Sequence, residues 1–323
     1  MGERYMEFRK LIGFGKSSFV ISLPKGWLAK NNLVKGSLIS VEEEGDQLFL
    51  GSKVGDEKKI EVINIDASGL DSSSILHYIQ AAYKKGFDEI NLKFNEREID
   101  NFKIKEKVSI YSVINKTVDR LVGLEVIKQS NNECTLKDIS ATSTQEFDNV
   151  LRRVFLLIKD LIESTHQGVV DNDKIMLENI QEKHDVITKF IAFCLRLLNK
   201  GGSRDSRKTA ILFHIIASLD KITDIYKYFA RDVVKNGIKL KKETIEILKI
   251  ANEEFNSYYG LFYKFESKTV VELSRKRRLA RGRMEELVKK ITPKEVYYAS
   301  HQIMVLDILL DIIESKIALN LTN

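Results

Sequence analysis

The feature that most constrains the fold is a long stretch, residues 143–323, in which apolar residues recur every three or four positions. A stripe with this period lies on one face of an α-helix. Proline interrupts the stretch only at Pro293. The period is clearest near the start of the stretch, at Val150, Leu151, Val154, Phe155, Leu157, Ile158, Leu161 and Ile162. The pattern predicts a bundle of long helices.

Capping signals help to divide this stretch into helices. Ser143 and Glu146 have the spacing of a capping box, and Thr292 and Glu295 have it too, with Pro293 at the first helical position. Six helices are expected, over residues 144–166, 173–199, 206–236, 241–264, 268–291 and 293–320.

The third and the sixth of these helices share a short pattern, displaced by 87 positions. In both helices a histidine, a leucine, two aspartates and an isoleucine follow one another at the same spacing. The residues are His214, Leu219, Asp220, Asp224 and Ile225 in one helix, and His301, Leu306, Asp307, Asp311 and Ile312 in the other. The repetition predicts that the bundle consists of two three-helix units. The two histidines are interpreted as structural.

Each repeat places two carboxylates at i,i+4 on one helix face, where like charges disfavour the helix unless a cation joins them. One interpretation is metal ligation, by a divalent ion or iron, on Asp220 and Asp224 and in parallel on Asp307 and Asp311. Two further carboxylates of the second helix, Glu182 and Asp185, could complete the first site. The alternative is a set of salt bridges or a solvated edge.

The corresponding helix of the second repeat carries six basic residues between Arg275 and Arg283. If the two repeats are equivalent, these arginines face Asp307 and Asp311, and the second site is an ion-pair network or an anion site. For the basic run itself, a solvated or bundle-paired face is favoured over nucleic acid contact.

Residues 1–55 have a different pattern, with frequent glycines and short strand-like segments. Strands are expected over 8–12, 18–23, 37–43 and 47–51, with a helical turn after Pro24. The first 36 residues contain seven basic and only two acidic side chains, a net charge of +5. So short a module buries little apolar surface alone, which favours dimerisation.

Residues 56–142 alternate between strand and helix patterns and predict a small α/β unit. Strands are expected over 59–65, 89–94, 124–129 and 134–138, and helices over 71–85 and 105–120. Gly86 is expected to end the first helix. No glycine-rich phosphate loop follows a strand in this part of the sequence.

Several classes of protein are excluded by the sequence. No apolar run reaches the roughly 18 residues of a membrane-spanning helix, and the charged start does not have the pattern of a secretory signal. Two cysteines, Cys134 and Cys194, cannot form a disulfide scaffold or a zinc finger. Gly15-Lys16-Ser17 lacks the first glycine of a phosphate loop, because position 10 is lysine. No catalytic constellation stands out, so an enzyme is not expected.

The segment Arg9-Lys-Leu-Ile-Gly-Phe-Gly-Lys-Ser-Ser-Phe-Val-Ile-Ser-Leu-Pro-Lys-Gly-Trp27, followed by Leu33-Val-Lys-Gly36, resembles the AbrB/SpoVT/MazE-type swapped-hairpin domain. The resemblance covers about 45 residues. It implies an intertwined dimer, in which a small β-barrel is formed by two chains and basic residues lie on DNA. The residues expected to contact DNA are Arg9, Lys10, Lys16, Ser17, Ser18 and Lys25.

Residues 143–323 resemble PhoU, a duplicated three-helix-bundle protein with an acidic motif in each repeat. Leu219-Asp220-x-x-x-Asp224 and Leu306-Asp307-x-x-x-Asp311 carry the resemblance. It implies regulation of phosphate transport and its signalling, with multinuclear metal clusters on the carboxylates. The basic residues of the second repeat depart from the family pattern. The order of the two modules resembles archaeal PhoU-like regulators with an AbrB-type head.

These observations predict a multidomain α+β chain with an AbrB-like domain at 1–55, a small α/β domain at 56–142 and a PhoU-like bundle at 143–323. The expected function is that of a cytoplasmic, homodimeric, DNA-binding transcription regulator of phosphate homeostasis. The alternative is an adaptor that regulates a phosphate transporter or signalling kinase by protein contact, without binding DNA.

Overall fold

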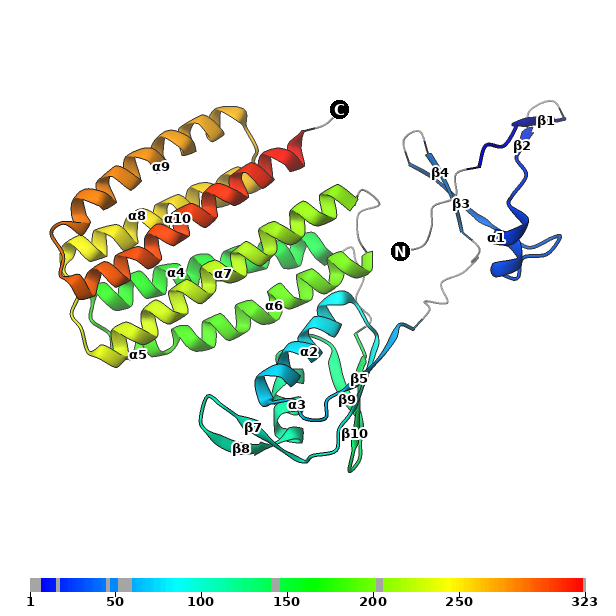
Figure 1. Cartoon of the computed structure of the whole chain (residues 1–323). Helices are drawn as coiled ribbons and strands as arrows, with labels where there is room; N and C mark the ends of the chain where they lie inside the picture. The colour runs from blue at the N-terminus through cyan, green and yellow to red at the C-terminus, as the bar shows by residue number, and fades with distance from the viewer. Residues whose placement is uncertain are drawn as a thin grey trace. The chain divides into compact units, whose positions relative to one another are not determined.

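The structure, a computed structural model, describes residues 7–15, 18–44, 47–51, 60–140, 146–201 and 206–321. The chain divides into two compact units, Met1–Lys59 and Ile60–Asn323, called here the N-terminal and the C-terminal unit (Figure 1).

The described part of the N-terminal unit consists of two antiparallel strand pairs and one short helix. Gly13 lies opposite Phe19 in the first pair, and Val41 lies opposite Leu50 in the second. Gly15, in the first connection, has a φ of 69°, which favours glycine. The elements are β1 (Ile12–Phe14), β2 (Ser18–Val20), α1 (Lys25–Lys30), β3 (Ser40–Glu44) and β4 (Gln47–Gly51).

The described residues of the N-terminal unit have no buried side chain. Large apolar side chains point to solvent instead, among them Phe14 and Phe19, each 70% exposed. A closed barrel is also absent from the described residues, because the two strand pairs do not pair with each other. The expected strand over 8–12 is wrong, because the first strand is Ile12–Phe14. The other three expected strands are present at least in part, and the described residues form no barrel.

The C-terminal unit begins with a four-stranded sheet in the order β5-β6-β10-β9. Strands β5 and β6 are parallel, and the other neighbours are antiparallel. A separate hairpin, β7-β8, follows β6. The strands are β5 (Val62–Asp66), β6 (Glu89–Lys93), β7 (Glu98–Asn101), β8 (Glu106–Ser109), β9 (Leu124–Gln129) and β10 (Glu133–Asp138).

Two helices, α2 (Ser72–Lys85) and α3 (Ile110–Val118), pack on this sheet through a common apolar cluster (Figure 1). Asp71 caps α2, and Gly86 ends it with a φ of 107°, as the sequence predicts. The expected helix over 105–120 is wrong at its start, because residues 106–109 form strand β8. Lys105, with a φ of 57°, turns the chain into that strand.

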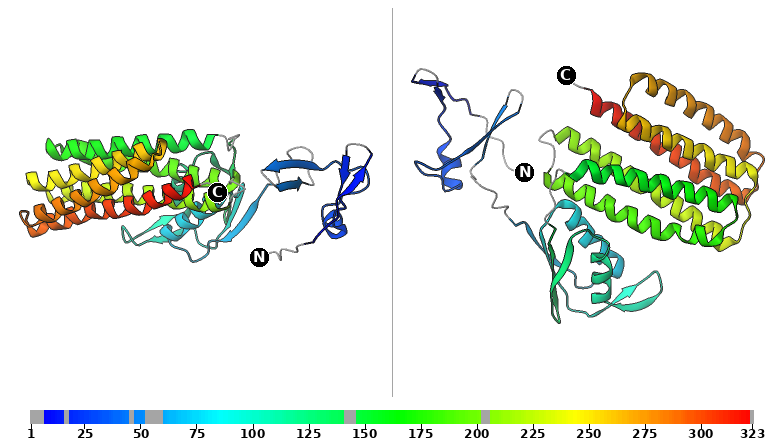
Figure 2. Two further views of the ribbon diagram at one scale, coloured as in Figure 1. Left: turned by 90° about the horizontal axis from the view of Figure 1, so that it is seen from above. Right: turned by 180° about the vertical axis from the view of Figure 1, so that it is seen from behind.

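The remainder of the C-terminal unit is a bundle whose long helices run side by side (Figures 1 and 2). Its predicted helices are confirmed to within a few residues, and Thr292 and Glu295 form the predicted capping box. Ser143, the expected cap of the first helix, lies outside the described residues. The helices are α4 (Phe147–Val170), α5 (Lys174–Glu178), α6 (Ile180–Gly201), α7 (Ser206–Asn236), α8 (Lys242–Tyr263), α9 (Ser267–Val288) and α10 (Pro293–Asn320).

One expected helix, 173–199, is divided in two at Asn179. The short α5 contributes Leu177 to the bundle core, and α6 begins at Ile180, which belongs to the same core. The side chain of Asp173 accepts the backbone N–H of Met176 and so caps α5.

Helix α6 packs against two apolar clusters at once. Cys194 and Leu195 belong to the bundle core, whereas Phe193 and Leu197 belong to the core of the α/β part. Between these positions Arg196, only 1% exposed, reaches into the α/β part. The sheet, its helices and the bundle are therefore joined within one unit.

The structure is mostly helical with small sheets. The expected boundary at residue 55/56 falls in a stretch outside the described residues, and the contact-based division lies at Lys59/Ile60. The expected boundary at 142/143 also lies outside the described residues, and the three-domain division remains a prediction. In the described ranges, no helix is long and apolar enough to cross a membrane.

Candidate functional site

The residues expected to contact DNA lie along the exposed N-terminal unit. Lys10 precedes β1, Ser18 begins β2 and Lys25 begins α1, and all three are exposed. Arg9 is exposed too, but its guanidinium forms an ion pair with Glu7. An exposed pair of this kind is worth little and leaves the arginine available to a phosphate. Lys16 and Ser17 lie outside the described residues.

The acidic pair of the first repeat lies on α7 and faces α6. The Nε2 atom of His184, on α6, is 3.0 Å from Oδ1 of Asp224. Lys227, one turn after Asp224, donates to the same oxygen and lies 3.1 Å from His184 Nε2. The hydrogen bond from His184, aided by Lys227, lowers the pKa of Asp224 to about 2. The carboxylate of Asp224 is thus held as an ion between a histidine and a lysine.

Asp220, one turn earlier on α7, is in a different environment. Burial raises the pKa of its carboxyl, and no described residue hydrogen-bonds to the buried Oδ1 atom. Nearby charges have opposing effects on the pKa of Asp220: Asp224 raises it and Lys227 lowers it. The two carboxylates of the motif therefore differ sharply although they share one helix face.

Of the two carboxylates expected to complete this site, Asp185 contacts other side chains of the site and Glu182 does not. Oδ1 of Asp185 lies 3.1 Å from His184 Nδ1, and its Oδ2 accepts Arg120 at 3.0 Å. Glu182 is exposed and takes no part in these contacts. The structure thus joins Asp185 to Asp224 through His184 and leaves Glu182 out.

The second repeat contains the ion-pair alternative. Asp307 accepts Arg281 at 2.9 Å and Arg277 at 3.3 Å, both from α9. Asp311 is exposed one turn further along α10. The two copies of the motif therefore have different partners, histidine and lysine in the first and arginines in the second.

The two repeated histidines, His214 and His301, contact other side chains of the bundle. The Nδ1 atom of His214 is 2.9 Å from the hydroxyl of Ser315, which joins α7 to α10. His301 packs edge-on against Tyr297 at 4.5 Å, and burial lowers its pKa.

Cationic side chains contact one carboxylate of each acidic motif, and the expected metal site remains a prediction. Lys227 and the arginines already neutralise Asp224 and Asp307, in the places that a cation would take. Among the described ranges, no group of three or more histidine, cysteine, aspartate or glutamate side chains is placed to hold a metal ion.

Sequence reasoning missed His184, Lys227 and Arg120. A signal for the first was present, because His184 occupies a position in the apolar stripe that Ile180, Ile187 and Ile191 continue. A polar residue in such a stripe needs a buried partner. Lys227 lies on the same face of α7 as the acidic pair, whereas the contact of Arg120 depends on tertiary structure.

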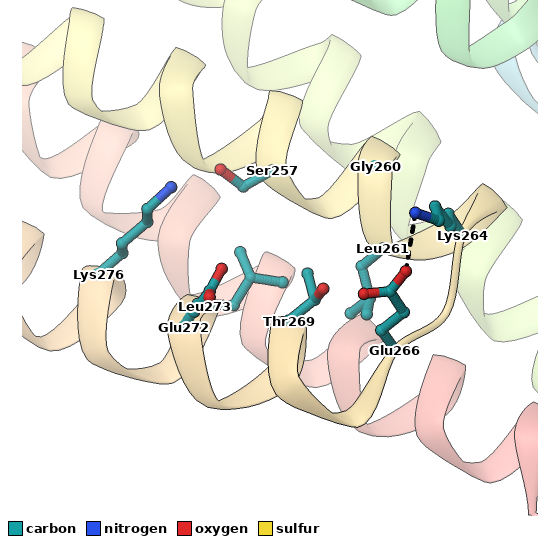
Figure 3. Close-up of a pocket in the computed structure, with 9 residues that line it drawn as sticks. All are labelled: Ser257, Gly260, Leu261, Lys264, Glu266, Thr269, Glu272, Leu273 and Lys276. Carbon is teal, nitrogen blue, oxygen red and sulfur yellow. Dashed lines mark ion pairs between the residues drawn. The ribbon is translucent and has the colours of Figure 1, made fainter.

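A groove of about 350 Å³ lies between the end of α8 and the start of α9 (Figure 3). Lys264 and Glu266 form an ion pair of 2.8 Å at one end, and Glu272 and Lys276 lie further along. Charges of both signs line the groove, so it does not select a ligand of one charge.

No protein-family model matches the chain, and no curated protein matches its sequence. A solved structure that is similar to part of it is the crystal structure of the phosphate transport system regulatory protein PhoU from Streptococcus pneumoniae. The two chains are 15% identical with a TM-score of 0.48, over 55% of this chain and 94% of that one. A likeness at this level does not extend to function.

Proposed function

We propose that the chain is a dimeric DNA-binding regulator without catalytic activity, in which the N-terminal unit contacts both DNA and a second copy. The observation that supports this most is that the described residues of this unit bury no side chain, while Phe14, Phe19 and their neighbours are exposed. Exposed apolar surface of this extent on so small a unit favours an interface.

The second copy is the occupant that fits this surface. The strands expose apolar side chains along two short pairs with free edges, and identical pairs can continue each other in a symmetric dimer. The resemblance of residues 9–36 to swapped-hairpin domains supports the same arrangement. The basic side chains of Lys10 and Lys25 would then be doubled on one assembly, as binding to a two-fold DNA site requires.

The helical bundle would serve as the sensing or partner-binding part, acting in the cytoplasm. The resemblance of its acidic motifs to those of PhoU supports phosphate homeostasis as the regulated process. No step of this proposal uses a metal.

The test is binding of the full chain to random genomic fragments at two salt concentrations, followed by sequencing of the bound pool. The variant carries Lys10→Glu, Lys16→Glu and Lys25→Glu. We expect an enriched sequence motif for the wild type and none for the variant, because the variant loses the basic side chains that contact the DNA phosphates. Each lost phosphate contact should also lower the slope of log affinity against log salt concentration by roughly one unit.

The matched control places the charge reversals Lys268→Glu, Lys289→Glu and Lys294→Glu on exposed positions of the bundle. It changes the net charge equally and should retain the motif. Equal loss in both variants would reduce the binding to general electrostatics, and absence of binding by the wild type would contradict the proposal.

One observation favours the adaptor as a second candidate. Arg275 and Arg278 are exposed on α9 beside the exposed Leu279, and neither arginine has an ion-pair partner among the described residues. Such a mixed basic and apolar stripe fits an acidic protein surface, such as a subunit of a phosphate transporter or a signalling protein. Co-purification of a partner that survives deletion of residues 1–55, but not Arg275→Glu with Arg278→Glu, would support it.

A further inference from the structure

A second hollow, called here the α2–α3 pocket, lies between α2, α3 and the β7-β8 hairpin. Its volume is about 320 Å³, at the small end of the range for ligand pockets. Three cationic side chains line it, Lys103 from the hairpin and Lys116 and Arg120 from α3 and its end. None of the described residues that line it is acidic. The pocket thus has the charge of an anion site, unlike the mixed groove between α8 and α9.

Polar donors also face this pocket. Ser72, at the first position of α2, lines the pocket and is 8% exposed. A serine hydroxyl at this position can donate a hydrogen bond to a ligand oxygen. Lys103 and Lys116 have no ion-pair partner within the described ranges, since Arg120 alone of the three is paired.

The N-terminus of α2 offers few free backbone N–H groups to an anion. Asp71 already accepts the backbone N–H groups of Ser73 and Ser74 and so occupies the donors of the first turn. Attraction of an anion here depends on the three cationic side chains and on Ser72.

The remainder of the lining points to an organic ligand. Leu76 and Val113 form an apolar wall beside the basic side chains. Three cations favour a doubly charged group over a single carboxylate, and hydroxyl and guanidinium donors suit its several oxygens. We propose that the α2–α3 pocket binds the phosphoryl group of a small phosphorylated molecule, with the organic part against Leu76 and Val113.

A contact of Arg120 links this pocket to the acidic motif of α7. Arg120 donates to Asp185, which contacts His184, and His184 contacts Asp224. A ligand in the pocket competes with Asp185 for the guanidinium of Arg120. Binding therefore changes the charge balance at α6 and α7, and this deepens the proposed function by supplying the effector of the regulator.

The test measures calorimetric binding of glycerol 3-phosphate, inorganic phosphate and glycerate to the full chain without DNA. Glycerol 3-phosphate should bind at least tenfold more tightly than glycerate, and comparison with inorganic phosphate shows whether an ester or the free ion is the ligand. Lys103→Gln and Lys116→Gln should each weaken binding about tenfold, as loss of a charge-assisted hydrogen bond does.

Lys107→Gln is the matched control, because Lys107 is exposed on the same hairpin but does not line the pocket. It should change the affinity by less than about twofold. Equal weakening by Lys103→Gln and Lys107→Gln, equal affinity for glycerate, or no binding of either phosphate compound would overturn the proposal.

The link to α6 has its own pair of variants. Asp185→Asn releases Arg120 and should tighten binding severalfold, whereas Glu182→Gln makes the same charge change on the exposed side of α6 and should not. Equal effects of the two would refute the link. Because the assay contains no DNA, its failure leaves the DNA-binding proposal standing, and failure of DNA binding leaves the pocket standing.

Discussion

The Nε2 atom of His184 and the Oδ1 atom of Asp224 lie 3.0 Å apart and join helices α6 and α7. Asp220, on the same face of α7, has no partner for its buried Oδ1 among the described residues. Neighbouring carboxylates of one motif thus act on stability in opposite directions.

Asp224→Asn should lower the stability of the C-terminal unit at neutral pH, and Asp220→Asn should raise it. Since the folded-state pKa of Asp224 is lowered to about 2, its contribution is present above pH 4 and lost as the pH falls towards 2. It amounts to about 1 kcal/mol after allowance for solvent screening. Since burial raises the pKa of Asp220, its ionisation opposes folding as the pH rises above 4.

Thermal unfolding of the two variants at pH 7 and pH 3 checks this prediction. A shift of about 2–4 °C in opposite directions is expected at pH 7 for a unit of this size. Both differences should shrink at pH 3. Shifts of the same sign at pH 7 would contradict it.

The equivalent substitution in the second repeat, Asp307→Asn, should change stability by less than about 0.5 kcal/mol. The side chain of Asp307 is half exposed, and so is that of Arg281, its closer partner, whereas Arg277 is only 23% exposed. Urea unfolding of Asp307→Asn and Asp224→Asn side by side measures the difference. A cost for Asp307→Asn as large as for Asp224→Asn would show that the two repeats are energetically equivalent.

Arg196→Met should destabilise the C-terminal unit by about 3 kcal/mol, because the buried Asp138 loses its nearer counter-charge and keeps, among the described residues, only Lys200, at 3.9 Å. The guanidinium of Arg196 lies 2.6 Å from Asp138, and it also donates to the backbone carbonyls of Tyr83 and Phe87. Denaturant titration followed by circular dichroism measures the loss. Arg196→Met with Asp138→Asn should recover part of it, and a double variant as unstable as the sum of both would argue against a direct charge pair.

Glu295→Gln should cost about 2 kcal/mol, since one carboxylate serves the starts of two helices. It accepts the N–H of Lys241 and the hydroxyl of Thr244 at the start of α8, and the N–H and hydroxyl of Thr292 at the start of α10. Burial alone would raise the pKa of Glu295, but these hydrogen bonds lower it. Its contribution is therefore lost as the pH falls below about 4.5.

Thermal unfolding at pH 7 measures this cost, with Glu243→Gln, in the first turn of α8, as the control. The control should stay within about 0.5 kcal/mol of the wild type. A similar loss for both variants would assign the effect to helix charge rather than to the shared carboxylate.

Phe19→Glu should convert the proposed dimer of the full chain to monomer. The matched control is Phe102→Glu, because Phe102 is exposed to a similar degree, 72% against 70%, but lies in the C-terminal unit. Light scattering after size exclusion gives the mass of each species. A dimer that survives Phe19→Glu, or one that Phe102→Glu also dissociates, would place the interface elsewhere.

Much of the C-terminal unit could be predicted because its signals are local. Apolar period and caps such as Thr292 act within one helix, and the helices begin and end within a few residues of the expected positions. Strand β8 was missed because its formation depends on pairing with β7, and a short polar segment carries no local sign of such pairing.

The candidate site was predictable only in part for the same reason. The acidic pairs stand out in the sequence because i,i+4 spacing is a local property. Their partners come from other helices, so the difference between Lys227 with His184 and Arg277 with Arg281 required the packing of α6 and α9. The contact of Arg120 with Asp185 joins positions 65 residues apart and has no signature in the sequence.

Helix α6 contributes Leu195 to the bundle core and Phe193 and Leu197 to the core of the α/β part. Neither part can be exchanged for a homologous one by recombination near residue 142. An α/β part exchanged in this way would lose the α6 side chains that complete its hydrophobic core. The α/β part and the bundle should consequently be inherited together, and insertions between them should be tolerated only where α6 stays in place.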